Sequence, residues 1–314
     1  MAFCGRSCPG AACFFRSGLS VMKLIIFGSG GRVGRVLCRA AAAAGHELIA
    51  PPRAECNLMA PEAVADFVLS HPADAVVNCA AIAGLEACAA DASAAHCVNA
   101  VAPAYMALAC RHSGARFVHF STDYVLDGRR PGLKDERAKC RPINIYGLSK
   151  LEGEQQVMEA YAESLILRVS WVCGCPERPG FPEGIVARAL RGESPAAIDD
   201  KFSLPTHAGD IARVALRLIP LRSIVGPLHV ASCGAPLSWH ACACLALQAA
   251  ASAGHLPHPP AVQRQKLAHA HFFREPRPAH TAMDTSALRA LGISMPTAAE
   301  CISRAVRDYL AASL

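Results

Sequence analysis

The chain has 314 residues, of which 53% are hydrophobic and 18% charged, enough apolar material for one large or two moderate globular domains. No apolar run reaches the roughly 18 residues that a membrane-spanning helix requires, so we expect no membrane partner. The net charge of +6 is spread without a dense Lys or Arg tract, which argues against nucleic acid as a partner.

Sixteen cysteines are scattered singly through the chain, in apolar surroundings such as RVLCRA and VVNCAA. The two C-x-C pairs, Cys173/Cys175 and Cys242/Cys244, have no matching second pair, and no C-x-x-C pair of zinc-ribbon spacing occurs. Free cysteine in such surroundings behaves as a small hydrophobe. We therefore expect reduced thiols, a cytoplasmic protein and no bound metal.

Residues 1–21 differ from the rest of the chain, because they include Arg6 and Arg16 but no acid. A basic, acid-poor segment is compatible with a targeting peptide. The segment MKLIIFGSGG, which starts at Met22, is typical of a natural beginning. We therefore favour the interpretation that residues 1–21 are a disordered extension or follow from a misassigned start codon.

From Met22 onward, apolar segments typical of buried strands alternate with segments typical of helices. Right-handed crossovers between parallel strands place helices on both faces of the sheet. The alternation predicts an α/β fold, a Rossmann-type doubly wound parallel sheet. The expected strands are 23–28, 46–52, 73–81, 116–123 and 164–172, and the expected helices are 32–45, 61–71, 99–114 and 146–162.

After residue 172 this regular alternation loosens, and Pro and Gly cluster in CGCPERPGFPEG. Scattered helical segments such as 209–219 and 238–254 follow. We expect an NAD(P)-binding domain at 22–172 and a smaller C-terminal α/β lobe at 173–314 that mainly binds substrate. A cleft between the two parts would then hold the active site.

Three glycines, Gly28, Gly31 and Gly34, follow the first expected strand in G-x-x-G-x-x-G spacing. Glycine there allows a tight turn and a close approach of the backbone to a pyrophosphate, and the N-terminus of the following helix favours the anion. The pattern predicts a dinucleotide cofactor. An acid that binds the ribose is missing after the second strand, where Arg53 can accommodate a 2′-phosphate instead, so we expect NADPH and leave NADH open.

Three polar residues, Thr122, Tyr146 and Lys150, carry the expected chemistry. Tyr146 and Lys150 lie four residues apart and share one face if their segment is helical. An ammonium beside a phenol lowers a phenol pKa that is ordinarily about 10. Tyr146 could then give a proton to a carbonyl that receives a hydride, while Thr122 orients the carbonyl oxygen.

These motifs resemble those of the extended short-chain dehydrogenase/reductases, whose signature is Y-x-x-x-K with an upstream Ser or Thr. Within them the chain is similar to the dTDP-4-dehydrorhamnose reductase family. The similarity runs from Met22 nearly to the C-terminus, on GSGGRVG, VVNCAA, VNAVAP, FSTDYVLDG, NIYGLSKLEGE, ILRVSWV, KFSLPT, GPLHVASCG and RPAHTAMDT. The resemblance implies NAD(P)H-dependent reduction of a nucleotide-linked 4-keto sugar, dTDP-4-dehydro-L-rhamnose, to dTDP-L-rhamnose.

The resemblance also implies roles for individual residues. Thr122, Tyr146 and Lys150 match the catalytic trio, and Asp123 and Trp171, with Thr122, match substrate-binding positions. KFSLPT and RPAHTAMD would help to shape the substrate side. The implied cofactor contacts, together with those expected from the glycine turn, are Gly28, Gly31, Arg32, Val33, Gly34, Arg53, Asn57, Leu58, Ala81, Ile82, Ala83, Tyr146 and Lys150.

Several positions depart from the pattern of the family. Asn57 replaces a usual acid, Ala89 replaces one of the two acids after the third strand, and Leu126 and Cys173 replace aromatic residues. Two alternatives therefore stay open: a reductase or epimerase of another nucleotide sugar, and a non-catalytic subunit resembling the regulatory subunit of methionine adenosyltransferase. The assembly is also open, with a homodimer among the options.

Overall fold

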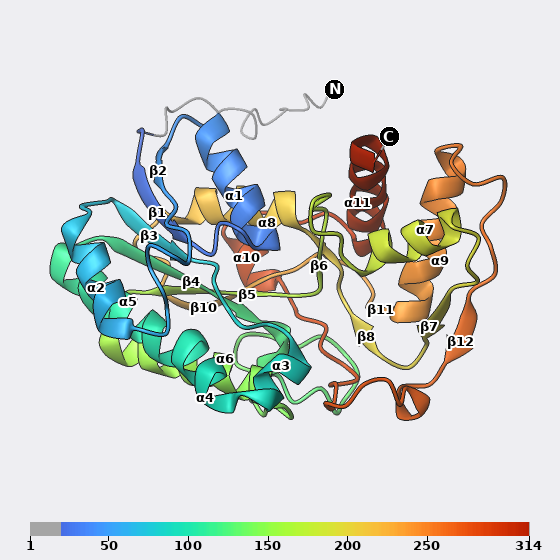
Figure 1. Cartoon of the computed structure of the whole chain (residues 1–314), viewed down its shortest axis with the longest axis horizontal. Coiled ribbons are helices and arrows are strands. Elements are labelled where there is room, and N and C mark those ends of the chain that lie inside the picture. Colours follow the sequence, from blue (N-terminus) through green and yellow to red (C-terminus); the bar gives the residue numbers. More distant parts are fainter. Residues whose placement is uncertain (1–19, 314) are drawn as a thin grey trace, which may run out of the picture.

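A parallel sheet of six strands lies at the centre of the computed structural model, which describes residues 20–313 (Figure 1). The strands lie in the order β10-β5-β4-β3-β1-β2, and every neighbouring pair runs parallel. Their apolar side chains are buried on both faces of the sheet, as is usual for parallel sheets. The strands are β1 (Lys23–Phe27), β2 (Glu47–Ile49), β3 (Ala75–Asn78), β4 (Arg116–Thr122), β5 (Leu165–Val169) and β10 (Gly226–Val230).

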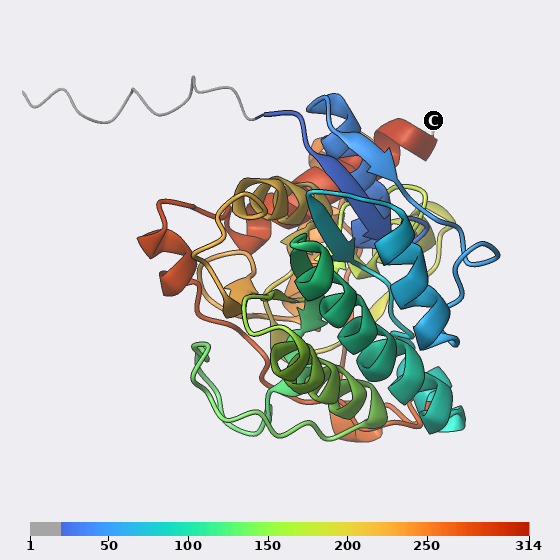
Figure 2. The same ribbon diagram turned by 90° about the vertical axis from the view of Figure 1, so that its left-hand side faces the viewer.

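Helices cover both faces of this sheet, and each layer encloses an apolar core. One face carries α1 (Arg32–Ala43), α8 (Ala208–Leu218) and α10 (Ser286–Ala290), and the other carries α2 (Pro61–Ser70), α5 (Ala102–Ser113) and α6 (Ile145–Ala160). Figure 2 shows α2, α5 and α6 side by side, coloured from blue to yellow-green. Between β3 and α5 the chain forms α3 (Leu85–Ala90), α4 (Ala92–His96) and a π-helical segment, η1 (Cys97–Val101).

The rest of the chain forms a smaller part at the right of Figure 1. Three helices pack together there around Val186, Ala246 and Ile302. Of the helices in residues 20–313, none combines the length and apolar composition that crossing a membrane requires. The elements are β6 (Val172–Cys173), α7 (Phe181–Leu190), β7 (Ala196–Ile198), β8 (Phe202–Ser203), β9 (Thr206–His207), β11 (Leu237–Ser238), α9 (Trp239–Ser252), β12 (Gln263–Gln265) and α11 (Ala298–Ser313), with short 3₁₀ turns η2 (Asp123–Val125) and η3 (Leu267–His269).

The doubly wound parallel sheet expected from the sequence is confirmed. The five expected strands correspond to β1 to β5: β1 and β4 each end one residue earlier than expected, and the other three are shorter at both ends. The sixth strand, β10, and the covering helix α8 come from the part of the chain after residue 172. The division into 22–172 and 173–314 stays a prediction, and most of the expected extension 1–21 lies outside the described residues.

A buried ion pair joins the helix α6 to the strand β5. The guanidinium of Arg168 donates from Nε to Glu154 Oε1 at 2.9 Å and from Nη2 to Oε2 at 2.6 Å. Their side chains are only 4% and 5% exposed. Because removing one partner leaves an uncompensated charge away from water, the pair ties α6 firmly to the sheet.

We predict that Glu154→Gln lowers the free energy of unfolding by about 3 kcal/mol, because the Arg168 charge stays buried without its carboxylate. Urea denaturation followed by circular dichroism measures this loss. The matched control is Glu193→Gln, whose carboxylate pairs with Arg188 and Arg191 on the surface, and which should leave the urea midpoint unchanged. Equal small effects of both substitutions would contradict the role of the buried pair.

Candidate active site

The backbone around the turn after β1 packs so tightly that two positions in the turn accept only glycine. Gly28 has φ +76°, and a Cβ there would lie 2.5 Å from the backbone nitrogen of Ala80. A Cβ on Gly34 would lie 2.2 Å from the carbonyl oxygen of Gly28, whereas a Cβ on Gly30 would meet nothing within 4 Å. The backbone N–H of Gly31 donates to Gly28 O at 2.9 Å and closes the turn. The cradle at the start of α1 therefore fits a pyrophosphate, as the sequence predicts.

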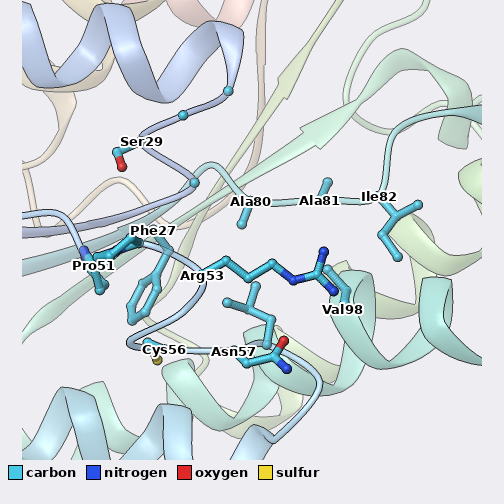
Figure 3. Close-up of a pocket in the computed structure, with 15 residues that line it drawn as sticks. Phe27, Ser29, Pro51, Arg53, Cys56, Asn57, Ala80, Ala81, Ile82 and Val98 are labelled. Carbon is cyan, nitrogen blue, oxygen red and sulfur yellow. The ribbon is translucent and has the colours of Figure 1, made fainter.

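A cavity of about 440 Å³ extends from this turn across the ends of β1, β2 and β3. Figure 3 shows the side chain of Arg53 reaching across the cavity toward Val98, with Asn57 beside it. Among the described residues no hydrogen bond or ion pair occupies the Arg53 guanidinium. The cavity walls include Gly28, Gly31, Arg53, Asn57, Leu58, Ala81 and Ile82, all of which are predicted cofactor contacts.

A second cavity, of about 830 Å³, adjoins the first, since Gly31 and Ala81 line both. It brings Thr122, Tyr146 and Lys150 together at the carboxyl edge of the sheet, as expected from their spacing. The other predicted residues in its walls are Arg32, Val33, Ala83, Asp123 and Trp171. Of the predicted site residues, only Gly34 lines neither cavity, because it packs under the glycine turn.

The loop residue Arg32 connects the two cavities in another way. Its side chain donates from Nε to Arg178 O at 2.8 Å and from Nη2 to Pro179 O at 3.1 Å. Arg178 and Pro179 form part of the wall of the second cavity. The cofactor loop is therefore joined directly to a segment that comes almost 150 residues later in the sequence.

Tyr146 does not have the lowered pKa that its spacing from Lys150 predicts. Burial raises the pKa of Tyr146 to about 12, and a hydrogen bond with Thr122 lowers it only in part. Lys150 does not offset this effect of burial: its Nζ donates to Phe120 O at 2.6 Å and lies 2.9 Å from His119 Nε2. The phenol thus keeps its proton at neutral pH, while burial lowers the pKa of Lys150 to about 8.

Asp123 lies between the catalytic threonine and a lysine that the sequence analysis did not single out. Its carboxylate accepts from Thr122 Oγ1 at 3.2 Å and from Ser170 Oγ at 3.0 Å. Lys201 is 1% exposed, donates to Pro278 O at 2.8 Å and lies over the rings of Tyr124 and Trp239. Burial raises the pKa of Asp123, and the charge of Lys201 and the hydrogen bonds of the carboxyl group oppose this shift only in part.

Aromatic side chains form the end of the second cavity that belongs to the smaller part. Trp171 has φ 40°, the only positive φ of a non-glycine residue in the described chain, and its ring stacks on Trp239 at 5.3 Å. Phe181 packs against both rings. A strained backbone held by such packing is typical of functional positions. Trp239, the first residue of α9, also forms part of the cavity wall.

Arg277 also lines the second cavity. Its Nη2 donates to Glu86 at 3.0 Å, which bridges the segment after η3 to α3. Both residues line the cavity, and Arg277 comes from the quoted segment RPAHTAMD. By contrast, Leu126 and Cys173, two of the departures from the family pattern, are buried and line neither cavity. These two departures therefore do not reshape the substrate side.

A doubly wound sheet, a glycine cradle after β1 and a Thr–Tyr–Lys group at the carboxyl edge together define a short-chain dehydrogenase/reductase, an oxidoreductase that uses NAD(P)H. The sequence model described as "RmlD substrate binding domain" matches residues 22–311. The chain belongs to this family.

Two similar enzymes and one solved structure support the same assignment. The chain is 33% identical to a dTDP-4-dehydrorhamnose reductase of Burkholderia thailandensis over 300 residues, 92% of this chain and 99% of that protein. It is 37% identical to the dTDP-4-dehydrorhamnose reductase of Mycolicibacterium smegmatis over 70% of this chain and 67% of that protein. The crystal structure of the Bacillus anthracis enzyme of this name, in complex with NADP, has a TM-score of 0.84 and 25% identity, and covers 92% of this chain and 99% of that chain.

We predict that Gly34→Ala weakens NADPH binding at least about tenfold, because the added methyl group overlaps Gly28 O and displaces the turn. Titration of cofactor fluorescence measures the dissociation constant. Gly30→Ala is the matched control, since its methyl group has free space, and should bind as the wild type does. Equal affinities of the two variants would show that the turn does not contact the cofactor.

Proposed function

We propose that this protein reduces the C4 keto group of dTDP-4-dehydro-L-rhamnose to give dTDP-L-rhamnose, with NADPH as the cofactor. The observation that carries the proposal is the position of Tyr146, Thr122 and Lys150 in the wall of a large cavity that adjoins the glycine cradle. The named reductases that the chain resembles support the same substrate.

Different residues of the chain perform different parts of this reaction. The glycine cradle and Arg53 hold the cofactor, which supplies a hydride to the keto carbon when it is bound. Tyr146 gives its phenolic proton to the keto oxygen, so that the product is an alcohol, and solvent later returns the proton to the tyrosinate. Thr122 hydrogen-bonds the same oxygen and orients it. The pKa of about 12 keeps Tyr146 protonated at neutral pH, which suits a proton donor in a reduction.

The substrate side offers groups suited to a nucleotide sugar. Asp123 presents a carboxylate held by Ser170, and such an acceptor can bind sugar hydroxyls. Arg178 and Arg277 line the same cavity and are cations suited to a diphosphate. The aromatic end formed by Trp171, Phe181 and Trp239 offers apolar surface to a ring.

NADPH is preferred over NADH in this proposal because Arg53 stands where a ribose-binding acid would stand. Its guanidinium is exposed, lies at the cavity wall and is suited to a 2′-phosphate. Solved relatives of the same fold bind either form of the cofactor: the Bacillus anthracis structure contains NADP, and a Thermus thermophilus UDP-glucose 4-epimerase, 19% identical to this chain, contains NAD. NADH therefore stays as the second cofactor to test.

Two further expectations remain proposals. A cytoplasmic location is supported by the cysteines of the described chain, which are all free. A homodimer would be revealed by light scattering coupled to size-exclusion chromatography.

We predict that Tyr146→Phe lowers kcat at least about 100-fold, because the proton donor is lost, while NADPH affinity changes little. The assay follows oxidation of NADPH in the presence of dTDP-4-dehydro-L-rhamnose. Tyr105→Phe, which removes a hydroxyl exposed on α5, is the control and should retain full activity. Wild-type binding of NADPH without turnover would favour another nucleotide sugar or a non-catalytic binding subunit.

We predict that Arg53→Ala raises the KM for NADPH by about tenfold or more, because a charge-assisted contact to the 2′-phosphate is lost. The KM for NADH should stay unchanged, since NADH has a hydroxyl at that position. Arg111→Ala, at the last turn of α5, controls for the loss of a positive charge. A parallel rise of both KM values would show that Arg53 does not select the cofactor.

A further inference from the structure

A buried chain of hydrogen bonds lies beneath the catalytic tyrosine and joins β3, β4 and α6. Asn78 Nδ2 lies 3.2 Å from His119 Nδ1, and Lys150 Nζ lies 2.9 Å from His119 Nε2. Asn78 and His119 are 0% exposed and Lys150 is 1% exposed. Neither Asn78 nor His119 lines the two cavities, and His119 reaches the site through its contact with Lys150.

The orientation of the Asn78 amide is fixed by the backbone. The N–H of Ala80 donates to Asn78 Oδ1 at 2.9 Å, so the amide oxygen faces Ala80 and the NH₂ group faces the imidazole. The NH₂ group can only donate. His119 Nδ1 must therefore be the acceptor of this hydrogen bond and carry no hydrogen of its own.

The hydrogen on the second ring nitrogen of His119, Nε2, then limits the charge that Lys150 can carry. Burial and the nearby Lys150 lower the pKa of His119 well below its ordinary value, so the imidazole is neutral and carries one hydrogen. With Nδ1 as acceptor, that hydrogen lies on Nε2 and points at Lys150 Nζ. An ammonium has no lone pair and would face it as a second donor. An uncharged amine accepts the hydrogen and still donates to Phe120 O at 2.6 Å.

We propose that His119 is a positioning residue which, fixed by Asn78 in the Nε2–H tautomer, donates to Lys150 and increases the uncharged fraction of this lysine before cofactor binds. In this arrangement each of the contacts between Asn78, His119, Lys150 and Phe120 O joins one donor to one acceptor. The inference rests on the proposed function only where it concerns turnover, because the tautomer and the charge of Lys150 can be measured without a substrate.

The charges around Lys150 do not override this effect. Glu154 is four residues further along α6, and its charge opposes the lowering of the Lys150 pKa only in part, since its carboxylate is bound to Arg168 from β5. Cys79 from the end of β3 is buried, and burial raises the pKa of its thiol, so it is neutral. Tyr146 on α6 is also protonated. In the described part of the chain Lys150 has no ion-pair partner.

Cofactor binding should therefore be linked to the uptake of a proton. An anionic dinucleotide beside Lys150 favours the ammonium, and the ammonium requires His119 to give up its hydrogen bond or change tautomer. The same contact lowers the fraction of Lys150 that carries a charge before binding.

The first test is nuclear magnetic resonance of the full-length protein without cofactor, with ¹⁵N-labelled histidine and ¹³C-labelled lysine. His119→Gln and Lys150→Met identify the two resonances by their disappearance. We expect a protonated Nε2 and an unprotonated Nδ1 in His119, and a Lys150 titration below its ordinary value of about 10.4. A protonated Nδ1, or a lysine that titrates at its ordinary value, would overturn the proposal.

The second test changes the tautomer by substitution. Asn78→Asp keeps the shape and the acceptor for Ala80 but makes an acceptor of the group that faces Nδ1. The hydrogen then moves to Nδ1, Nε2 becomes an acceptor, and the Lys150 titration should rise by about one pH unit or more. Proton uptake on NADPH binding, measured by calorimetry in buffers of different ionisation enthalpy, should fall accordingly.

The added negative charge is controlled by the double variant Asn78→Asp/His119→Phe, which keeps the carboxylate and removes the imidazole. A rise of the Lys150 titration in the single variant that disappears in the double variant supports transmission through His119. An equal rise in both would assign the effect to the charge and reject the proposal. Because these measurements need no turnover, their outcome is independent of whether the protein reduces a nucleotide sugar.

Discussion

The whole site depends on the parallel direction of the strands. Two parallel strands that follow one another in the chain must be joined by a crossover that returns to the starting edge, so every carboxyl end lies at the same edge of the sheet. At that edge the chain places Gly28 after β1, Arg53 after β2, Ala81 after β3 and Thr122 at the end of β4. Residues that are distant in sequence thus meet in two adjoining cavities.

Features that depend on near neighbours in the sequence could be predicted from it. The glycine turn, the alternation of strands and helices, and the shared face of Tyr146 and Lys150 all follow from short-range spacing. The addition of β10 to the sheet and the burial of Lys201 depend on contacts between distant segments. A lysine in KFSLPT carries no local sign that it is enclosed by Tyr124 and Trp239.

The electrostatics of the catalytic residues could not be predicted for a related reason. Spacing on a helix sets which side chains share a face, but the direction of a flexible ammonium is set by the acceptors around it. Lys150 finds Phe120 O and His119 on β4, and so it does not lower the pKa of Tyr146. Burial then dominates the pKa of the phenol, and the sequence gives no measure of burial at that point.

The contacts of Arg32 with the carbonyl oxygens of Arg178 and Pro179 have a thermodynamic consequence. One side chain belongs both to the loop that cradles the cofactor and to the packing of the wall around the substrate. Any shift that an occupied cradle imposes on Arg32 changes the free energy of the wall, and by linkage an occupied wall changes the cradle equally. If binding shifts Arg32, the affinities of this protein for its cofactor and for its substrate are therefore coupled.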